Sequence, residues 1–218
     1  MGYALNFTDG SAYEHALGKV VCVGRNYAEH AKELNNPIPT EPILFIKPES
    51  SAVSLNQDFK IPKTDCHYET EIAILIGSKL TNATETQAEA AIIGLGLALD
   101  LTRRALQSRL KEKSHPWEIA KSFDGACPLS DFVKRDQFSE LNKLTFSLHI
   151  NGELKQIGRS EDMLTPIVPL IAYISKYFTL KPGDIVLTGT PKGVGTLHSG
   201  DKLIFKLMEQ LQLETMSI

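Results

Sequence analysis

The chain alternates short apolar runs with turn-forming stretches, a pattern that is typical of a protein rich in buried strands. Most of these runs are continuously apolar rather than alternating, as expected for strands that are covered on both faces. The predicted strands are KVVCVG (19–24), ILFIKP (43–48), ETEIAILIG (69–77), IIGLGLALDLT (92–102), IVLTGT (185–190) and DKLIFKL (201–207). The fourth contains small residues that allow close packing, and its apolar run ends at Asp100.

Helical patterns are fewer and shorter. Their signals are a cap residue at Asn26, a possible capping box at 84–87, amphipathic spacing, and a proline suited to a first helical turn. They predict helices over 26–34, about 85–91, 103–113, and from Thr165-Pro166 to about Tyr177. A hairpin is expected over 144–158, because Asn151-Gly152 suits a type I′ turn. Many strands with few helices favour an α+β fold with a mixed sheet system over a regular βαβ series.

Composition limits the domain number, the partners and the compartment. A length of 218 residues with 42% hydrophobic residues suits one large domain, residues 1–218, better than two. The formal net charge of −3 offers no basic surface for nucleic acid, and no apolar run is long enough for a membrane span. Three widely spaced cysteines, Cys22, Cys66 and Cys127, indicate neither a disulfide framework nor a zinc knuckle. Since MGYALNFTDG also lacks a signal-peptide pattern, we expect a cytoplasmic protein.

Two glutamates at the start of the third predicted strand are the first candidates for chemistry. Glu69 and Glu71 are two residues apart, so their side chains point to the same side of the strand. Taken alone, such a pair is more often part of a solvated face. A third carboxylate nearby, from Asp100, would change this interpretation, because a divalent cation neutralises the mutual repulsion of buried carboxylates. Oxygen-only ligands favour Mg²⁺ or Mn²⁺ over Zn²⁺ and leave about three coordination positions for a bidentate 2-oxo acid and a water.

Several basic residues are weaker candidates. His30 and Glu33 are three residues apart on the first predicted helix, so the carboxylate can orient the imidazole and raise its basicity. Lys121, Arg25 and Arg104 could each meet the negative charge of an enolate. Each of these features alone is also consistent with ordinary surface charge.

The stretch TGTPKGVG (188–195) is a candidate of another kind. It combines a strand end, a threonine hydroxyl and three glycines, so its backbone N–H groups can approach a carboxylate closely. It is not a Walker motif, because no G-K-[ST] follows at the required spacing. The alternative is a tight loop between two strands with no ligand.

A family resemblance is carried by seven segments: VGRNYAEHAKE, PILFIKPESS, HYETEIAILIG, ALDLTRRALQ, PWEIAKSFDGACP, INGELKQ and GDIVLTGTPKGVG. In this order and spacing they resemble the fumarylacetoacetate hydrolase family, in particular its short members without an extra N-terminal domain. The similarity extends from about Lys19 to Lys206. The clearest departure is Met208-Glu209-Gln210, where the family is often richer in glycine.

The resemblance implies a fold, a metal site and an assembly. The fold would be a β-rich roll of mixed sheets with a few short helices, usually in a homodimer. Glu69, Glu71 and Asp100 match the family's ligands for Mg²⁺ or Mn²⁺. The other positions that match functional residues are His30 and Glu33 (the lid), Lys121 (the active-site lysine), and Arg104, Gln107 and Thr190 (substrate contacts).

The residues and the resemblance together predict a metal-dependent hydrolase of small 2,4-dioxo acids, the acylpyruvates. Closure of a lid over 26–35 would bring His30, oriented by Glu33, to a water that attacks the distal carbonyl. Cleavage of the C–C bond would then release a carboxylic acid and a pyruvate enolate stabilised by the metal and Lys121.

Other reactions of the same site stay open. The same enolate would arise by decarboxylation of oxaloacetate or by keto–enol tautomerisation. Neither needs an activated water, so both could survive loss of His30. Isomerisation with decarboxylation of unsaturated dicarboxylates from aromatic breakdown is a further alternative. The non-enzymatic alternative is a silent metal-binding scaffold.

Overall fold

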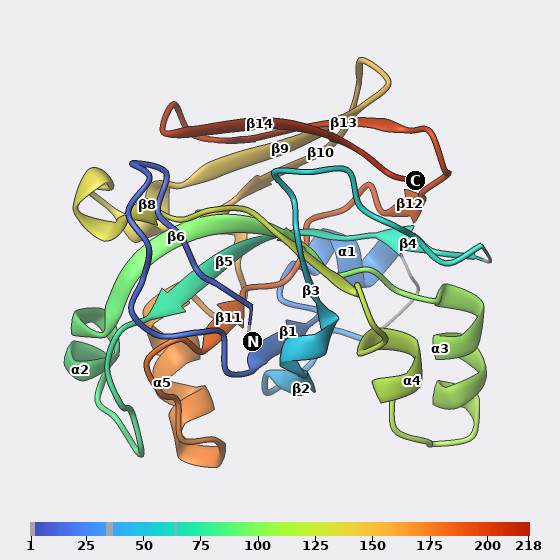
Figure 1. The fold of residues 1–218 in the computed structure, drawn as a ribbon. Helices are drawn as coiled ribbons and strands as arrows, with labels where there is room; N and C mark the ends of the chain where they lie inside the picture. The colour runs from blue at the N-terminus through green and yellow to red at the C-terminus, as the bar shows by residue number, and fades with distance from the viewer. Residues whose placement is uncertain (1–2, 34–36, 64) are drawn as a thin grey trace.

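The computed structural model describes residues 3–33, 37–63 and 65–218, and within them the largest feature is an eight-stranded mixed sheet (Figure 1). Its strands follow the order β2-β1-β11-β5-β6-β7-β3, and β8 pairs with β6. Their bounds are Val20–Gly24 (β1), Ile43–Lys47 (β2), Ala52–Ser54 (β3), Thr70–Ile76 (β5), Ile92–Leu99 (β6), Cys127–Leu129 (β7), Val133–Lys134 (β8) and Ile185–Leu187 (β11). Strand β1 pairs in parallel with β11, and β3 with β7, whereas the other pairs are antiparallel. The expected mixed sheet is therefore confirmed.

A second, antiparallel sheet lies above the first in Figure 1 and has the order β10-β9-β13-β14. Its strands are Thr145–Ile150 (β9), Glu153–Arg159 (β10), Lys202–Leu207 (β13) and Leu211–Met216 (β14). The predicted β9–β10 hairpin is confirmed, and Asn151 and Gly152 have the positive φ values, 53° and 83°, that a type I′ turn requires. The two-residue strands β4 (His67–Tyr68) and β12 (Gly195–Thr196) pair with each other just before β5 begins.

The helices in the described ranges are short: Ala28–Glu33 (α1), Glu85–Ala90 (α2), Arg104–Glu112 (α3), Glu118–Lys121 (α4) and Ile167–Tyr177 (α5). The capping box of α2 is confirmed, since Thr84 Oγ1 accepts the Gln87 N–H at 3.3 Å and Gln87 Oε1 accepts the Thr84 N–H at 2.9 Å. Helix α5 begins one residue after the expected position, because Pro166 is extended and acts as the N-cap residue. None of these helices has both the length and the apolarity that crossing a membrane requires.

The first helix differs from the prediction for 26–34. It begins at Ala28, and the Asn26 side chain does not cap it. Asn26 instead forms hydrogen bonds of 2.8 to 3.0 Å with the backbone of Thr165 and Thr188. It therefore ties the start of α1 to the segments before α5 and after β11. The end of the predicted helix and of the predicted lid, Leu34 and Asn35, lies outside the described residues.

The central strand β5 is buried on both faces, which explains its unbroken apolar sequence. Alternate residues face two different hydrophobic clusters, Ile72, Ile74 and Ile76 the larger, and Ala73 and Leu75 the smaller. On the side of the smaller cluster β6 carries glycines, and a Cβ on Gly94 would lie 3.0 Å from Phe132 Cβ. The small residues of β6 thus permit the close packing that the sequence predicted.

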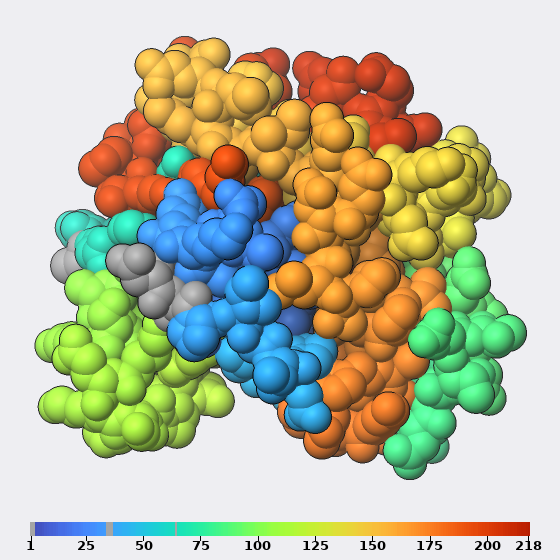
Figure 2. Space-filling model, turned by 180° about the vertical axis from the view of Figure 1, so that it is seen from behind, coloured from blue at the N-terminus to red at the C-terminus, as the bar shows by residue number. Residues whose placement is uncertain are grey.

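Figure 2 shows the molecule from behind, where the blue segment through β1, α1 and β2 lies between the lime-coloured α3 and α4 region and the orange α5. The blue and lime segments contribute most of the lining of the pocket described below, including Arg25, His30, Phe45, Arg104 and Trp117. The fold thereby brings residues separated by about half the chain to one place.

Candidate metal centre

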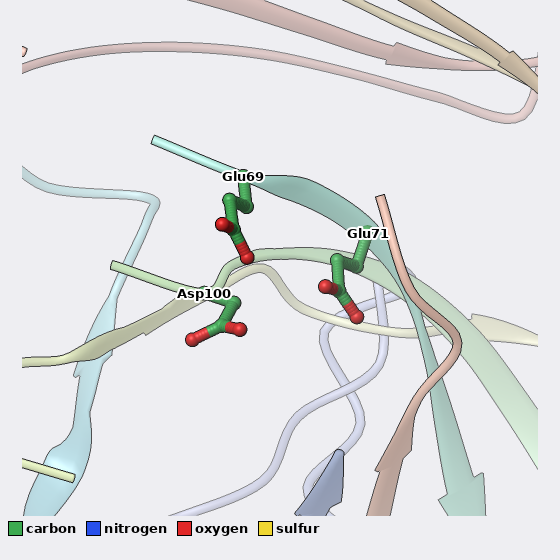
Figure 3. A group of neighbouring side chains, drawn as sticks. All are labelled: Glu69, Glu71 and Asp100. Atoms are coloured by element: carbon green, nitrogen blue, oxygen red, sulfur yellow. The ribbon is translucent and has the colours of Figure 1, made fainter. Parts of the chain in front are cut away.

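The pairing of β5 with β6 brings three carboxylates together. Glu71 stands opposite Ala98 in the ladder, and the Asp100 N–H donates to the Glu69 carbonyl at 2.8 Å. Because residues two apart share one face, Glu69, Glu71 and Asp100 project to the same side of two neighbouring strands. Figure 3 shows their carboxylates turned toward one another, and one oxygen from each lies within 4.8 Å of the others. All three residues are at most 4% exposed. The strand register thus supplies the proximity of Asp100 on which the metal hypothesis depended.

Two of these carboxylates are neutralised by cationic side chains. Lys121 Nζ lies 2.8 Å from Glu69 Oε2 and 2.5 Å from Asp100 Oδ2. Lys47 Nζ lies 2.8 Å from Asp100 Oδ1, and Arg104 pairs with Glu69. Burial disfavours the charge on Glu69, but Lys121 and Arg104 outweigh it and hold its pKa well below the ordinary value. Burial also opposes the charge on Lys121, yet Asp100 and Glu69 raise its pKa, so the ammonium group stays protonated.

Glu71 has a different environment. Its Oε2 accepts the Gly189 N–H at 2.6 Å, and among the described residues no lysine or arginine nitrogen lies within 4.0 Å of its carboxylate. Burial, with repulsion from Asp100 and Glu69, raises the pKa of Glu71 well above the ordinary value. Glu71 is therefore the carboxylate of the cluster without an ion-pair contact to a lysine or arginine among the described residues. A hard divalent cation bound by oxygen ligands would provide such a contact, so the donor set fits Mg²⁺ or Mn²⁺.

An open pocket lies against the cluster. Of the residues predicted from the sequence to form the site, only Glu33 is missing from its lining. Those that line it are Arg25, His30, Glu69, Glu71, Asp100, Arg104, Gln107, Lys121 and Thr190. The remaining lining residues, which the sequence did not indicate, are Val23, Gly24, Phe45, Ser108, Lys111 and Trp117.

Glu33 contacts His30 from outside the pocket. Its Oε2 lies 3.3 Å from His30 Nδ1, and His30 is only 5% exposed. This contact matches the orienting role predicted from their spacing on the helix. With Nδ1–H directed at Glu33, the other ring nitrogen, Nε2, is the one available as a proton acceptor.

The 188–195 loop has backbone N–H groups bound to carboxylates, as its glycines predicted, but these carboxylates belong to the protein itself. Gly189 donates to Glu71, and Gly193 donates to both oxygens of Glu33 at 3.0 and 3.2 Å. Gly189 has a φ of 90°, and a Cβ added to it would lie 2.7 Å from Asn26 Cβ, so a side chain does not fit here. The loop consequently connects the carboxylate cluster with α1.

Donor groups on α3 complete the pocket. Arg104 Nη1 donates to Gln107 Oε1 at 2.8 Å, which leaves the amide N–H groups of Gln107 as donors. Burial opposes the charge on Arg104, but Glu69 raises its pKa. Arg25, which also lines the pocket, has a φ of 61° and a pKa lowered by burial. These donors beside the carboxylate cluster suit a small anionic ligand with several acceptor oxygens.

Residues 19–216 match the family described as fumarylacetoacetate (FAA) hydrolase, C-terminal. The chain belongs to this family. It is 51% identical over 197 residues to the oxaloacetate tautomerase YcgM of Escherichia coli strain K12, covering 89% of this chain and 90% of that protein. It is 42% identical over 185 residues to the mitochondrial oxaloacetate decarboxylase of Dictyostelium discoideum, covering 84% and 85%. A crystal structure of fumarylpyruvate hydrolase from Pseudomonas aeruginosa, in complex with Mn²⁺ and pyruvate, superposes with a TM-score of 0.93 at 31% identity and covers 100% and 96%.

Membership of the fumarylacetoacetate hydrolase family confirms the resemblance seen in the sequence, and these relatives are enzymes. The two curated relatives act on oxaloacetate by name, and the hydrolase is the more distant of the three in sequence. Acylpyruvate hydrolysis, the activity expected first, is therefore less well supported than the oxaloacetate alternative.

Two buried polar residues beside the site, Lys47 and Gln156, were not predicted from the sequence. Lys47 is fully buried and pairs with Asp100. A sequence feature could have identified it, because it shares the inward face of β2 with Phe45, two residues earlier. Gln156, on β10, is 1% exposed and bonds to Thr70 and Thr190. It stands between exposed residues of an edge strand, and in the sequence only its place at the end of the segment INGELKQ marks it.

Proposed function

We propose that this protein is a divalent-metal-dependent oxaloacetate tautomerase, which interconverts the keto and enol forms. The proposal is carried by the buried cluster of Glu69, Glu71 and Asp100, in which Glu71 has no ion-pair contact to a lysine or arginine among the described residues. The cluster faces a pocket whose lining includes Arg25, Arg104 and Lys121. The 51% identity to an oxaloacetate tautomerase supports the choice of substrate and reaction.

The three carboxylates would hold Mg²⁺ or Mn²⁺, which when bound polarises the 2-oxo group and makes the neighbouring C3 hydrogens more acidic. Mn²⁺ accompanies pyruvate in the related fumarylpyruvate hydrolase, which supports this choice of ion. Lys121, kept protonated by Glu69 and Asp100, can donate a hydrogen bond to the oxygen that becomes negative. Arg104, Gln107 and Thr190 would bind the carboxylate groups of the substrate.

Tautomerisation transfers a proton between C3 and the oxygen on C2. It needs no water, but it does need a proton acceptor. His30 lines the pocket with Nδ1 held by Glu33, so Nε2 can take the C3 proton. The protonated Lys121 cannot accept a proton, but it can supply the one that the C2 oxygen gains. Conversion of the enol to the keto form runs the same two transfers in reverse. From the sequence, both tautomerisation and decarboxylation were expected to survive loss of His30. If His30 exchanges the C3 proton, only decarboxylation should be independent of it.

Hydrolysis of acylpyruvates is a second candidate, favoured by the same His30–Glu33 pair. An imidazole oriented by a carboxylate can activate water as well as accept a proton from carbon. The structural similarity to a fumarylpyruvate hydrolase also supports it. Decarboxylation of oxaloacetate, the activity named for the Dictyostelium relative, would use the same metal and the same pocket.

The test is to dilute enol oxaloacetate into buffer containing EDTA-treated protein, with and without Mg²⁺, and to follow the ultraviolet absorbance of the enol. Pyruvate release is measured in parallel with lactate dehydrogenase, and acetylpyruvate is assayed separately. We expect Mg²⁺-dependent loss of enol without pyruvate in the wild type and no acceleration in Glu71→Gln or Asp100→Asn. Pyruvate formed as fast as the enol is lost would indicate a decarboxylase. Cleavage of acetylpyruvate without any reaction of oxaloacetate would indicate a hydrolase. No reaction with either compound would indicate a silent scaffold.

A further inference from the structure

We propose that Gln156 is a positioning residue that makes the Thr190 hydroxyl a hydrogen-bond donor toward the substrate. Gln156 belongs to the four-stranded sheet and does not line the pocket. This inference rests on the proposed function, since it assumes that a small oxo acid with acceptor oxygens occupies the pocket.

The side-chain amide of Gln156 makes three hydrogen bonds in a buried position. Its Nε2 donates to Thr190 Oγ1 at 2.8 Å and to the Pro191 carbonyl at 3.0 Å. Its Oε1 accepts the Thr70 N–H at 2.9 Å. Both N–H groups and the carbonyl of the amide therefore have partners, as a buried amide requires.

The two backbone partners determine which end of the amide is which. The Thr70 N–H can only donate and the Pro191 carbonyl can only accept. If the amide were flipped, its NH₂ group would face the Thr70 N–H and its oxygen would face the Pro191 carbonyl, and neither contact is a hydrogen bond. Nε2 must therefore be the atom that faces Thr190. Since one of its hydrogens is bound by Pro191, the other is the one donated to the Thr190 hydroxyl.

A hydroxyl that accepts a hydrogen bond in this way directs its own proton elsewhere. Among the described residues no acceptor is in hydrogen-bond contact with the Thr190 hydroxyl, and Thr190 lines the pocket. The proton is thus available to an acceptor in the pocket. A carboxylate or 2-oxo oxygen satisfies it, whereas an ammonium or amide N–H group at the same point would leave the hydroxyl proton without an acceptor.

The same amide also contacts the carboxylate strand. Thr70 lies between Glu69 and Glu71, so Gln156 holds the backbone that carries both candidate ligands and, at its other end, the candidate substrate contact Thr190. The inward position of Gln156 depends on an irregularity in the β9–β10 pairing between Leu154 and Gln156. The second sheet thereby fixes the spacing between the two halves of the site.

The test is a double-mutant cycle on the KM for oxaloacetate, using Gln156→Glu, Thr190→Val and the combination. A carboxylate at 156 can only accept, so it would draw the Thr190 proton away from the pocket. We expect Gln156→Glu to raise KM about tenfold or more, the range for losing a hydrogen bond to a charged group, with a smaller change in kcat. In the Thr190→Val background the same substitution should change KM less than threefold.

Equal effects of Gln156→Glu in both backgrounds would overturn the proposal, because the residue would then act without the Thr190 hydroxyl. So would an unchanged KM in the single variant. If Gln156→Glu does not fold, Gln156→Met removes the donor without adding charge, and the same non-additivity with Thr190→Val is expected.

The matched control is Lys155→Gln, which changes the exposed neighbour on β10 and should leave KM unchanged. Failure of the proposed function is recognised separately, as absence of oxaloacetate turnover in the wild type. In that case the cycle is measured on the Kd of the Mn²⁺-loaded protein for oxalate, a dianion with acceptor oxygens only. Additive effects on that Kd overturn the role of Gln156, and non-additive effects support it.

Discussion

The carboxylate cluster and the second sheet (β10-β9-β13-β14) both contain close ion pairs, but the surroundings of these pairs differ. Lys121 lies 2.8 Å from Glu69, and these side chains are 3% and 6% exposed. On β10, Lys155 lies 2.6 Å from Glu153, with 37% and 75% exposed. An exposed pair contributes about 0 to 1 kcal/mol, whereas removing one partner of a buried pair costs about 3 to 5 kcal/mol, since a charge is left buried without compensation.

The two pairs have similar contact distances, so it is their burial that decides how much the loss of one partner lowers the free energy of unfolding. Desolvation makes the pocket charges costly, and replacing such charges with apolar residues is often neutral or stabilising in proteins. A cluster that also holds the buried Glu71 is therefore poorly explained by stability. The proposed binding of a cation and a charged substrate would explain it.

Among variants that keep all three carboxylates of the cluster, the largest effect is expected when His30 is changed to Ala. Tautomerisation should fall about a hundredfold or more, because the group that exchanges a proton with C3 in both directions is lost. Stopped-flow measurement of enol absorbance with saturating Mg²⁺ provides the rate. The control is Glu29→Ala on the same helix, whose exposed pair with Lys32 should not matter. An unchanged rate in His30→Ala would remove this residue from the reaction.

Changing Lys47 to Met should weaken Mn²⁺ binding by about 10 to 100-fold. Lys47 is fully buried and holds Asp100, and residues that orient metal ligands contribute effects of about this size. Calorimetric titration of EDTA-treated protein measures the affinity. If Lys47→Met bound Mn²⁺ as tightly as the wild type, Lys47 would be only a structural counter-ion.

A buried ion pair outside the pocket shows whether loss of a buried charge affects stability alone or also affects metal binding. Asp184 is 2% exposed, pairs with Lys19 and accepts the backbone N–H groups of Lys19 and Lys181 at 3.0 and 2.9 Å. We expect Asp184→Asn to lower the free energy of unfolding by about 2 kcal/mol, since Lys19 is partly exposed and the loss is reduced accordingly. Urea unfolding measures this loss. Mn²⁺ affinity should not change, and a large loss of affinity would show that buried charge anywhere in the sheet affects the site.

The smallest effect is expected for a substitution on the second sheet. Lys155→Ala should change the free energy of unfolding by less than about 0.5 kcal/mol and leave turnover unaltered, because its pair with Glu153 is exposed. Thermal and urea unfolding of the variant provide the comparison. A loss above about 2 kcal/mol would contradict the distinction between the two regions.

Much of the fold could be predicted from the sequence because strands buried on both faces have continuous apolar runs. β1, β5 and β6 are examples, and the capping box of α2 and the β9–β10 turn have local signatures of their own. The role of Asn26 was wrong, because its side chain bonds to Thr165 and Thr188, far away in the sequence. Local pattern does not report such distant partners.

The candidate site was predictable only in part. Residue parity put Glu69 and Glu71 on one face, but the register of β6 against β5, which brings in Asp100, is a tertiary property. Gln156 depends on a strand irregularity that has no sequence signature here. The single domain over 1–218, the homodimer and the cytoplasmic location stay predictions.

Dependence of the reaction on a metal held by the three carboxylates can be measured by titrating EDTA-treated protein with Mn²⁺ and following electron paramagnetic resonance and tautomerase activity in the same samples. We expect saturation at about one ion per chain, activity that rises in proportion to the occupied sites, and loss of both in Asp100→Asn. Full activity in the presence of EDTA, or saturable binding that Asp100→Asn leaves unchanged, would contradict this dependence.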